Sequence, residues 1–321
     1  MQKGGKLMAI TQRCYGKETD FDAVSDFLVR HYRPLNRDGN CFQPIWEYSY
    51  THPYTDLSLL DKIGIWEDDN EIVGVAFFET YLVDVFLNVH PKYQFLKPEM
   101  LTYAENHMTD IDKNGNRFFR IYVNDFDNEL KKTVESRGYQ RDPEHDRAMA
   151  QFKIPKPFPP IRLPEGFKLK SLAEDNDLRK IHRVLHRGFD HPGEPPEDEL
   201  KDRKRMQSGP HFRKDLNIVV EAPTGDFVSY CGMWCDSVNH FAYVEPVATD
   251  PDYRRRGFAS AAVLEGIRRC TIEGATVAYV WGVRPIYTSL GFKKIFSQNC
   301  WIKHFDDETQ QRHKLPATAS N

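Results

Sequence analysis

The feature that most constrains the fold of this chain is a proline-rich segment that lies between two similar halves. Five prolines fall within FKIPKPFPPIRLPEGF, from Phe152 to Phe167. Because proline lacks an amide donor and has a fixed φ, such a segment can continue neither a helix nor a central strand. We therefore expect a first domain at residues 1–153, a stiff linker at residues 154–166 and a second domain at residues 167–321.

The same landmarks occur in the same order in both halves. A strand follows a turn-prone stretch at EIVGVAFFE and again at DFVSYCGMWC, and the segments VHPKYQ and TDPDYR come next. A helix and another strand follow, and ESRGYQR and TSLGFKK each contain a glycine that ends a helix. The similar spacing of these landmarks indicates a tandem duplication. The order of elements predicts an α+β fold of three layers, in which helices cover a mixed sheet.

The composition narrows the class of protein. With 321 residues, of which 40% are hydrophobic, the chain is long enough for two globular domains. A net charge of -3 gives no overall reason to bind nucleic acid or an anionic membrane. No apolar run approaches the length of a membrane span, the first residues lack the pattern of a signal peptide, and the six cysteines are too sparse for a disulfide scaffold. We expect a cytoplasmic protein without nucleic-acid or membrane partners.

A glycine turn in the second half predicts an anion site. In VATDPDYRRRGFAS a strand-like run ends at Asp250, and three arginines and Gly257 precede the small residues that open a helix. The first amides of a helix are unpaired and carry partial positive charge, so phosphates bind there if the backbone is accessible. The chain has neither GxxxxGK[ST] nor GxGxxG. A solvated basic turn before a surface helix is the alternative interpretation.

Together these motifs resemble the GNAT superfamily of acyl-CoA-dependent N-acetyltransferases. Arg254, Gly257 and Ala259 match its [QR]-x-x-G-x-[GA] signature, and PIYTSLGFKK resembles a later motif with a tyrosine, here Tyr287, four residues before Gly-Phe. The resemblance covers roughly residues 163–305 and extends weakly over residues 8–153. It implies two tandem GNAT-like domains, each a mixed, mostly antiparallel sheet with helices on both faces, of which the first is a degenerate copy.

The resemblance implies acetyl-CoA as cosubstrate and direct transfer of the acetyl group to a primary amine of a small molecule, such as an antibiotic or a metabolite. The amide of Val247 would face the thioester carbonyl, Ala248 and Thr249 would contact the pantetheine arm, and Arg254 would hold the turn in place. The diphosphate would lie on the turn and the first helical residues, namely Arg255, Arg256, Gly257, Phe258, Ala259 and Ser260.

Transfer to an amine also requires two proton movements. The family commonly places its general acid at the position of Tyr287, and a phenol can protonate a leaving thiolate. Glu245 is the candidate base, because on a regular strand it would point to the same face as Val247. The alternative for Glu245 is a strand-edge charge beside Pro246, which can itself cause a bulge. Asp250 and the acidic segment at residues 191–202 are candidates for holding a cationic acceptor.

The first half departs from the pattern. Lys97 and Glu99 stand where the second half has Gly257 and Ala259, Pro98 removes an amide donor, and Val134 replaces the tyrosine. We expect no CoA site there, and instead a domain that packs on the second half or walls the acceptor site. Aromatic residues that could line that site, or simply pack in the core, are Trp46, Tyr48, Tyr50 and Tyr54.

Other functions are weaker fits. A CoA-responsive sensor without catalysis would not need Tyr287 and Glu245, and a mycothiol-synthase-like acetyltransferase is an analogy of two-domain architecture. His182 and His186 have the spacing of a helical zinc pair, but no further ligand motif accompanies them, so we expect no metal. We expect a monomer or a homodimer.

Overall fold

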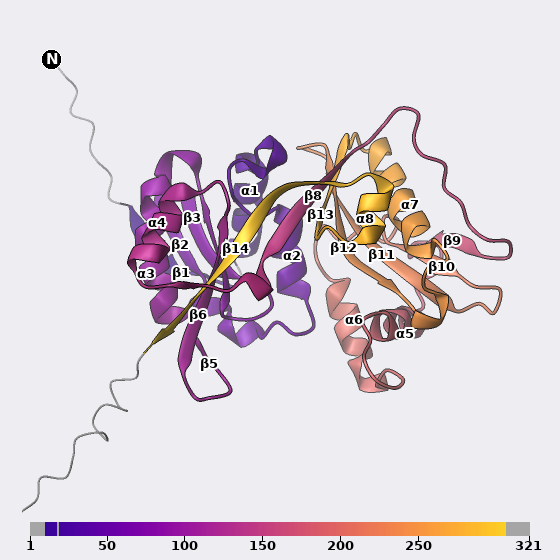
Figure 1. The fold of residues 1–321 in the computed structure, drawn as a ribbon, viewed down its shortest axis with the longest axis horizontal. Helices are drawn as coiled ribbons and strands as arrows, with labels where there is room; N and C mark the ends of the chain where they lie inside the picture. The colour runs from indigo at the N-terminus through magenta and orange to yellow at the C-terminus, as the bar shows by residue number, and fades with distance from the viewer. Residues whose placement is uncertain (1–9, 18, 306–321) are drawn as a thin grey trace, which may run out of the picture.

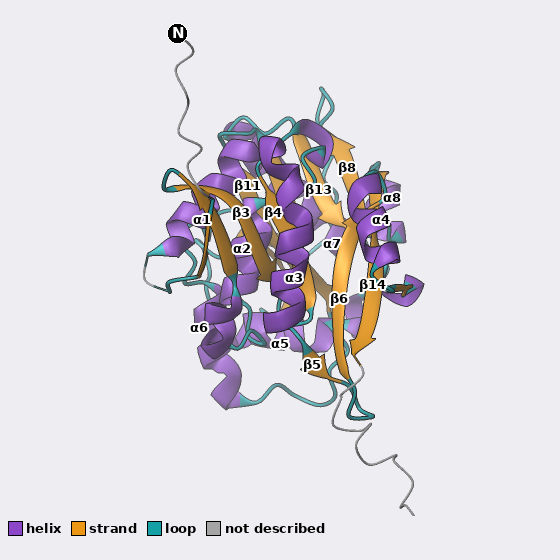
Figure 2. Cartoon of the chain, turned by 90° about the vertical axis from the view of Figure 1, so that its left-hand side faces the viewer, coloured by secondary structure: helices purple, strands orange, loops and turns teal. Residues whose placement is uncertain are grey.

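The computed structural model describes residues 10–17 and 19–305. Figure 1 shows two halves with a continuous sheet between them, and Figure 2 shows the helices that cover the first half. The described elements of the first half are β1 (Thr11–Cys14), α1 (Asp20–His31), α2 (Gln43–Thr51), β2 (Gly64–Asp68), β3 (Glu71–Phe78), β4 (Asp84–Val89), α3 (Lys97–His107), β5 (Asp110–Ile111), β6 (Arg117–Asn124), α4 (Asn128–Ser136), β7 (Gln140–Arg141) and β8 (Arg147–Lys153).

The second half repeats this order of elements. Its strands and helices are β9 (Lys168–Ser171), α5 (Leu178–Gly188), α6 (Leu200–Met206), β10 (Ile218–Glu221), β11 (Phe227–Asp236), β12 (Phe241–Thr249), α7 (Phe258–Ile272), β13 (Val277–Trp281), α8 (Pro285–Leu290) and β14 (Lys293–Phe305). Short 3₁₀ segments lie at Pro34–Asn36, Leu57–Lys62, Pro91–Leu96, Pro143–His145, Glu197–Glu199 and Pro251–Tyr253. Residues 154–166 contain neither helix nor strand.

One sheet runs through both halves in the order β1-β2-β3-β4-β6-β14-β8-β13-β12-β11-β10-β9. The final strands are exchanged. β14 of the second half pairs antiparallel with β6, and β8 of the first half pairs antiparallel with β13. Both strands cross between the halves in Figure 1. The sheet therefore does not divide at the linker, and the exchange fixes how the two halves face each other.

Helices cover both faces of the sheet in each half, as the sequence predicts. In the first half the ring of Trp46 on α2 lies 5.3 Å from that of Phe77 on β3. On the other face of β3, Met100 of α3 lies against Gly74. In the second half Leu185 of α5 belongs to one buried cluster, whose other members include Val219, Tyr230 and Ala248. Ile267 of α7 belongs to another, whose members include Val220, Cys231 and Val244. This alternation is that of strands buried on both faces.

Two pairs of parallel neighbours diverge and open the sheet. β12 pairs with β13 only from Phe241 to Tyr243, although β12 continues to Thr249. In the first half β4 pairs with β6 only at Asp84 and Val85. Beyond these points one edge of each strand lacks a neighbouring strand. The two gaps occupy equivalent places in the two halves, but the residues around them differ.

Over the described residues, the chain forms no helix with the length and apolar character that a bilayer crossing requires.

Candidate active site

The glycine turn of the second half leaves a helix N-terminus open. Gly257 precedes α7 with φ +83°, a conformation that disfavours side chains with a Cβ. No side chain of the described residues caps this helix end, and the first intrahelical bond runs from the Ala261 amide to the Gly257 carbonyl oxygen at 2.9 Å. The amides of Phe258, Ala259 and Ser260 therefore have no partner within the helix. The turn presents donors and positive dipole to whatever lies before it.

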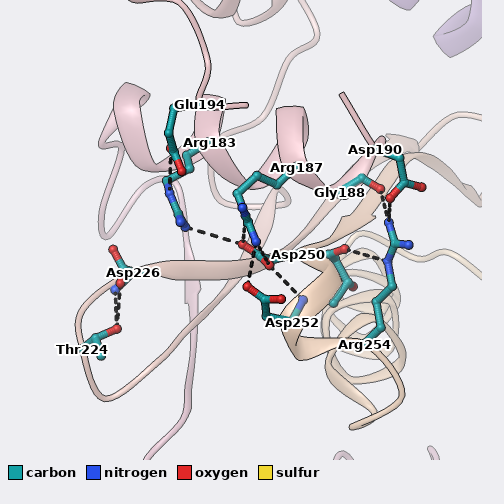
Figure 3. Close-up of polar contacts among 11 residues, drawn as sticks. Arg183, Arg187, Gly188, Asp190, Glu194, Thr224, Asp226, Asp250, Asp252 and Arg254 are labelled. Atoms are coloured by element: carbon teal, nitrogen blue, oxygen red, sulfur yellow. Dashed lines mark hydrogen bonds and ion pairs between the residues drawn. The ribbon is translucent and has the colours of Figure 1, made fainter. Parts of the chain in front are cut away.

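Arg254 ties this turn to the end of α5. Its Nε donates to the Thr249 carbonyl oxygen at 3.2 Å, and its Nη2 donates to the Gly188 carbonyl at 2.9 Å and to the Asp190 carboxylate at 2.8 Å (Figure 3). Arg255 and Arg256 are exposed, and no salt bridge within the described chain involves them. Arg254 thus orients the turn, Arg255 leaves positive charge at the mouth of the site, and Arg256 lies over the Tyr253 ring.

Asp250 does not have the role that the sequence suggested for it. Its side chain is 1% exposed, and Arg187 donates to both of its carboxylate oxygens at 2.6 and 3.1 Å (Figure 3). It also accepts from the Asp252 amide at 3.1 Å, and these contacts lower the pKa of Asp250 against the opposing effect of burial. A buried, paired carboxylate cannot hold a cationic acceptor. The expectation for Asp250 was wrong because its arginine partner comes from a distant helix.

A cavity of about 800 Å³ lies in front of the turn. Its walls come from the end of α5, the last part of β12, the start of α7 and α8. Of the residues that the sequence singled out, it contains Val247, Ala248, Thr249, Arg254, Arg255, Gly257, Phe258, Ala259, Ser260 and Tyr287. Arg256 and Glu245 are not among its lining residues. The local order strand, turn and helix is what brings most of these residues together.

The free edge of β12 forms one side of this cavity. The Asp250 amide donates to the Val228 carbonyl oxygen at 3.0 Å, so Asp250 and Ala248 bond toward β11. By the alternation of an antiparallel pair, Val247 and Thr249 direct their amides and carbonyls the other way, toward the gap between β12 and β13. The Thr249 carbonyl already accepts from Arg254, so an extended ligand in this gap would find the amides of both residues and the Val247 carbonyl.

Tyr287 reaches the same cavity from α8. Its side chain is 7% exposed, and burial raises its pKa above the usual tyrosine value. Among the described residues, no protein hydrogen bond engages its hydroxyl, although the ring packs against Phe292 at 5.7 Å. The hydroxyl is therefore protonated at neutral pH and free to donate to a group within the cavity.

Glu245 occupies a bulge rather than a regular strand position. Cys231 pairs with Val247 and Met233 with Val244, so Glu245 and Pro246 together oppose the single residue Gly232. A Cβ on Gly232 would lie 2.2 Å from the Glu245 carbonyl oxygen, which explains the glycine. The bulge breaks the alternation that would have placed Glu245 and Val247 on one face. This was the alternative that Pro246 raised at the level of sequence.

The Glu245 carboxylate lines a second cavity, of about 410 Å³. Burial and the neighbouring charge of Glu79 raise its pKa to about 7. The Tyr243 hydroxyl lies 3.4 Å from its Oε2. Phe189 lines both this cavity and the larger one, so the two meet at that ring. A carboxylate with a pKa close to neutral can accept a proton and release it again at the pH of most cells.

The equivalent gap of the first half is filled by the chain itself. The His90 amide donates to the Val73 carbonyl oxygen at 2.8 Å, so the polar groups of Val89 face the side of β6. There the side-chain amide of Asn40 accepts from the Val89 amide at 2.8 Å and donates to its carbonyl at 3.2 Å. Asn124, at the end of β6, donates to the Gly39 carbonyl at 3.1 Å. A buried loop thus occupies the place of an added strand.

The substituted motif positions of the first half are also engaged internally. Lys97 forms an ion pair with Asp127, and Glu99 accepts from the Trp66 indole at 2.8 Å. Val134, at the position equivalent to Tyr287, is fully buried in the core. These side chains make structural contacts where the second half has open backbone and a hydroxyl.

The four aromatic residues of α2 and its following loop have different places. Tyr48 and Tyr54 line the cavity that contains Glu245. Trp46 is 2% exposed in the core, and Tyr50 packs on Phe21 at 4.9 Å. Sequence alone could not separate the two groups, because all four side chains are of the same type on one short segment.

Part of the chain is similar to known acetyltransferases. Residues 170–295 match the family model described as an acetyltransferase (GNAT) domain. A curated mycothiol acetyltransferase of Saccharomonospora viridis is 26% identical over 159 residues, which are 46% of this chain and about half, 51%, of that protein.

Solved structures resemble the whole chain. A GCN5-related N-acetyltransferase from Sphaerobacter thermophilus has a TM-score of 0.62 at 15% identity and covers 92% of this chain and 95% of its own. A tandem GNAT protein from the clavulanic acid biosynthesis pathway also has a TM-score of 0.62, at 11% identity over 93% and 100% of the two chains. A Saccharomyces cerevisiae N-myristoyltransferase with bound myristoyl-CoA has a TM-score of 0.53 at 13% identity and covers 94% and 80%.

The fold is therefore that of proteins with two GNAT domains in tandem. Residues 170–295 match a GNAT acetyltransferase domain, as the motifs predicted, and the chain as a whole has the fold of solved tandem GNAT proteins.

Proposed function

We propose that the chain is an N-acetyltransferase that moves an acetyl group from acetyl-CoA to a primary amine of a small molecule by direct transfer. The observation that carries this proposal is a single cavity with three properties. An uncapped helix N-terminus, the last part of β12 and Tyr287 all line it. The site carries the proposal, because the fold alone is shared by many activities.

The second half would hold the cosubstrate. The amides of Gly257, Phe258, Ala259 and Ser260 would bind the diphosphate, with Arg255 and Arg256 adding charge at the mouth. Arg254 would act through its bonds to the backbone and to Asp190. The pantetheine arm would lie along β12 beside Val247, Ala248 and Thr249, and take up the strand edge that β13 leaves free.

The reaction forms a C–N bond and breaks the thioester C–S bond. The Val247 amide, held by the sheet, would donate to the carbonyl oxygen as negative charge develops on it. The attacking amine loses a proton, which Glu245 would accept, and the leaving thiolate gains one from Tyr287. Both groups then return to their starting states by exchange with water, so protons balance over one turnover.

The two cavities suggest where the substrates meet. The acyl donor would occupy the larger cavity, and the acceptor would occupy the one lined by Glu245, Tyr48 and Tyr54, with Phe189 between them. On this proposal the first half binds no CoA, because Asn40 already fills its strand gap, and instead it supplies a wall of the acceptor site.

A direct test is calorimetric titration of the purified chain with acetyl-CoA, followed by measurement of thiol release with a library of amines. The proposal expects one acetyl-CoA per chain and amine-dependent thiol release. Binding without turnover for every amine would favour a CoA-responsive sensor instead. No binding at millimolar ligand would refute the proposal.

The resemblance to a mycothiol acetyltransferase supports a more specific proposal, in which this chain acetylates the same acceptor amine as that enzyme. Thiol release with the amine precursor of mycothiol, compared with simple amines, tests this candidate.

A further inference from the structure

The second cavity is built by both halves. Tyr48, Tyr54 and Glu79 enter it from the first half, and Arg203, Met206 and Glu245 enter it from the second. Arg205 joins these elements: its guanidinium donates to the carbonyl oxygens of His52 and Thr55, the latter at 2.9 Å. The position of α6 against the end of α2 is thereby fixed, and with it the position of Arg203 in the cavity wall.

Arg203 is a partly buried cation that has no carboxylate partner among the residues that the structure describes. Its Nε donates to Nδ1 of His182 at 3.1 Å, and its Nη1 lies 2.8 Å from the sulfur of Met206. His182 is 2% exposed, and its other ring nitrogen lies 3.2 Å from the Pro196 carbonyl oxygen, so the imidazole serves as a neutral support. Across residues 10–17 and 19–305, Arg203 takes part in no ion pair.

An unpaired cation in this place is unfavourable. Removing a guanidinium from water costs free energy unless hydrogen bonds and an opposite charge compensate it. Burial accordingly lowers the pKa of Arg203. His182 and Met206 are both neutral, and they engage Nε and one hydrogen of Nη1. Nη2 and the second hydrogen of Nη1 remain available to an anion within the cavity. A planar carboxylate is the group that fits such a fork with two parallel bonds.

The same cavity also carries negative charge. Glu79 is compensated by its ion pair with Arg147. Glu245 has only the Tyr243 hydroxyl, at 3.4 Å, and no arginine or lysine within ion-pair distance in the described chain. The charges of both Glu245 and Arg203 act on the Tyr48 hydroxyl, which places all three in one electrostatic environment. The cavity thus offers one cation and one uncompensated carboxylate.

We propose that the acceptor is an aminocarboxylate, whose carboxylate binds Arg203 and whose amine lies at Glu245. This inference rests on the proposed acetyl transfer and names its substrate class. Leu185, Phe189 and Met206 supply apolar surface between the charged groups, so an amino acid with an apolar or aromatic side chain fits the lining best. The amine would then point toward the cavity that Phe189 shares.

The test compares amines that differ only in the carboxylate. The purified full chain is given acetyl-CoA with matched pairs, such as L-phenylalanine and 2-phenylethylamine, L-leucine and 3-methylbutylamine, and the aminophosphonate analogue of phenylalanine. Thiol release is followed over a range of acceptor concentrations. We expect kcat/KM to be about 10 to 100 times higher for the amino acids, the range for a charged hydrogen-bonded contact.

Variants assign the effect to Arg203. Arg203→Met should lower kcat/KM for L-phenylalanine by about 10- to 100-fold, mainly through KM, and leave 2-phenylethylamine unchanged, while Arg203→Lys should recover part of the loss. Lys201→Met, an exposed charge removal on the same helix, is the matched control. Thermal unfolding and acetyl-CoA calorimetry of each variant show that the fold and the donor site persist.

The outcomes separate the two proposals. Equal or better use of decarboxylated amines, with acetyl-CoA bound normally, would overturn the aminocarboxylate inference and leave acetyl transfer standing. A preference for the phosphonate would keep the anion at Arg203 but overturn the carboxylate. Failure to bind acetyl-CoA would instead contradict the proposed function itself.

Discussion

The raised pKa of Glu245 predicts how the activity depends on pH. A base must be deprotonated to accept a proton, and burial and the charge of Glu79 raise the pKa of Glu245 to about 7. We therefore expect kcat/KM to fall as pH decreases through about 7. About half of the enzyme is active at pH 7 and about a tenth at pH 6, so kcat/KM should drop about fivefold over that unit. The assay is initial-rate thiol release between pH 5 and 9 with acetyl-CoA saturating.

Two substitutions test the cause of this pH dependence. Glu245→Gln removes the base and should lower kcat by about 10²- to 10⁴-fold. The fall of kcat/KM at low pH, the acid limb of the profile, should also be lost in this variant. Glu79→Gln removes the repelling charge and frees Arg147, and both effects favour the ionised form of Glu245. The acid limb of that variant should move to lower pH.

The reasoning would be refuted by an acid limb that survives in Glu245→Gln, or by one that moves to higher pH in Glu79→Gln. Thermal unfolding of both variants serves as the control, because Glu79 pairs with the partly buried Arg147. The attacking amine also titrates over this range, so kcat/KM is expressed on the concentration of its neutral form, with one acceptor used throughout.

Three further predictions follow from single contacts. Tyr287→Phe should lower kcat by about 10²-fold or more, measured by thiol release, with unchanged acetyl-CoA affinity by calorimetry. Gly232→Ala should lower the free energy of unfolding in urea by about 2 kcal/mol or more, because its Cβ would lie 2.2 Å from the Glu245 carbonyl oxygen; a change near zero would contradict the bulge. The buried Glu47 raises the pKa of His211, at an Oε2–Nδ1 distance of 2.6 Å. The stabilisation from this pair should therefore be fully present below the usual histidine pKa, and it should disappear as the pH rises through the raised pKa of His211. The free energies of unfolding of wild type and His211→Ala, measured in urea, should differ most at low pH.

The arrangement of the residues around Gly257 could be predicted from sequence because it is local. Val247 to Ser260 form one strand, one turn and one helix start, so the spacing of glycine and small residues determines their arrangement. Tyr287 joins them through a short helix whose end, at Gly291, is also visible in the sequence. The roles of these residues in binding and catalysis stay predictions.

The rest depends on contacts between distant segments. The hydrophobic pattern identifies β8 and β14 as strands, but it does not say which half each strand joins. From the sequence, the Asp250 carboxylate was a candidate to hold a cationic acceptor. In the structure it pairs with Arg187, which lies on α5. In the sequence Arg203 is one of several consecutive charged residues. Its hydrogen bond to His182 depends on the packing of α5 against α6. A single sequence carries no signal for such pairings.

The central claim is that the backbone at Gly257 binds the diphosphate of acetyl-CoA and that the first half has no such site. Calorimetric titration of the purified chain with acetyl-CoA, beside the variant Gly257→Val, tests it most directly. The account predicts one site per chain in the wild type and little or no heat in the variant, because a β-branched residue does not tolerate φ +83°. Two sites per chain, or equal binding by Gly257→Val, would contradict it.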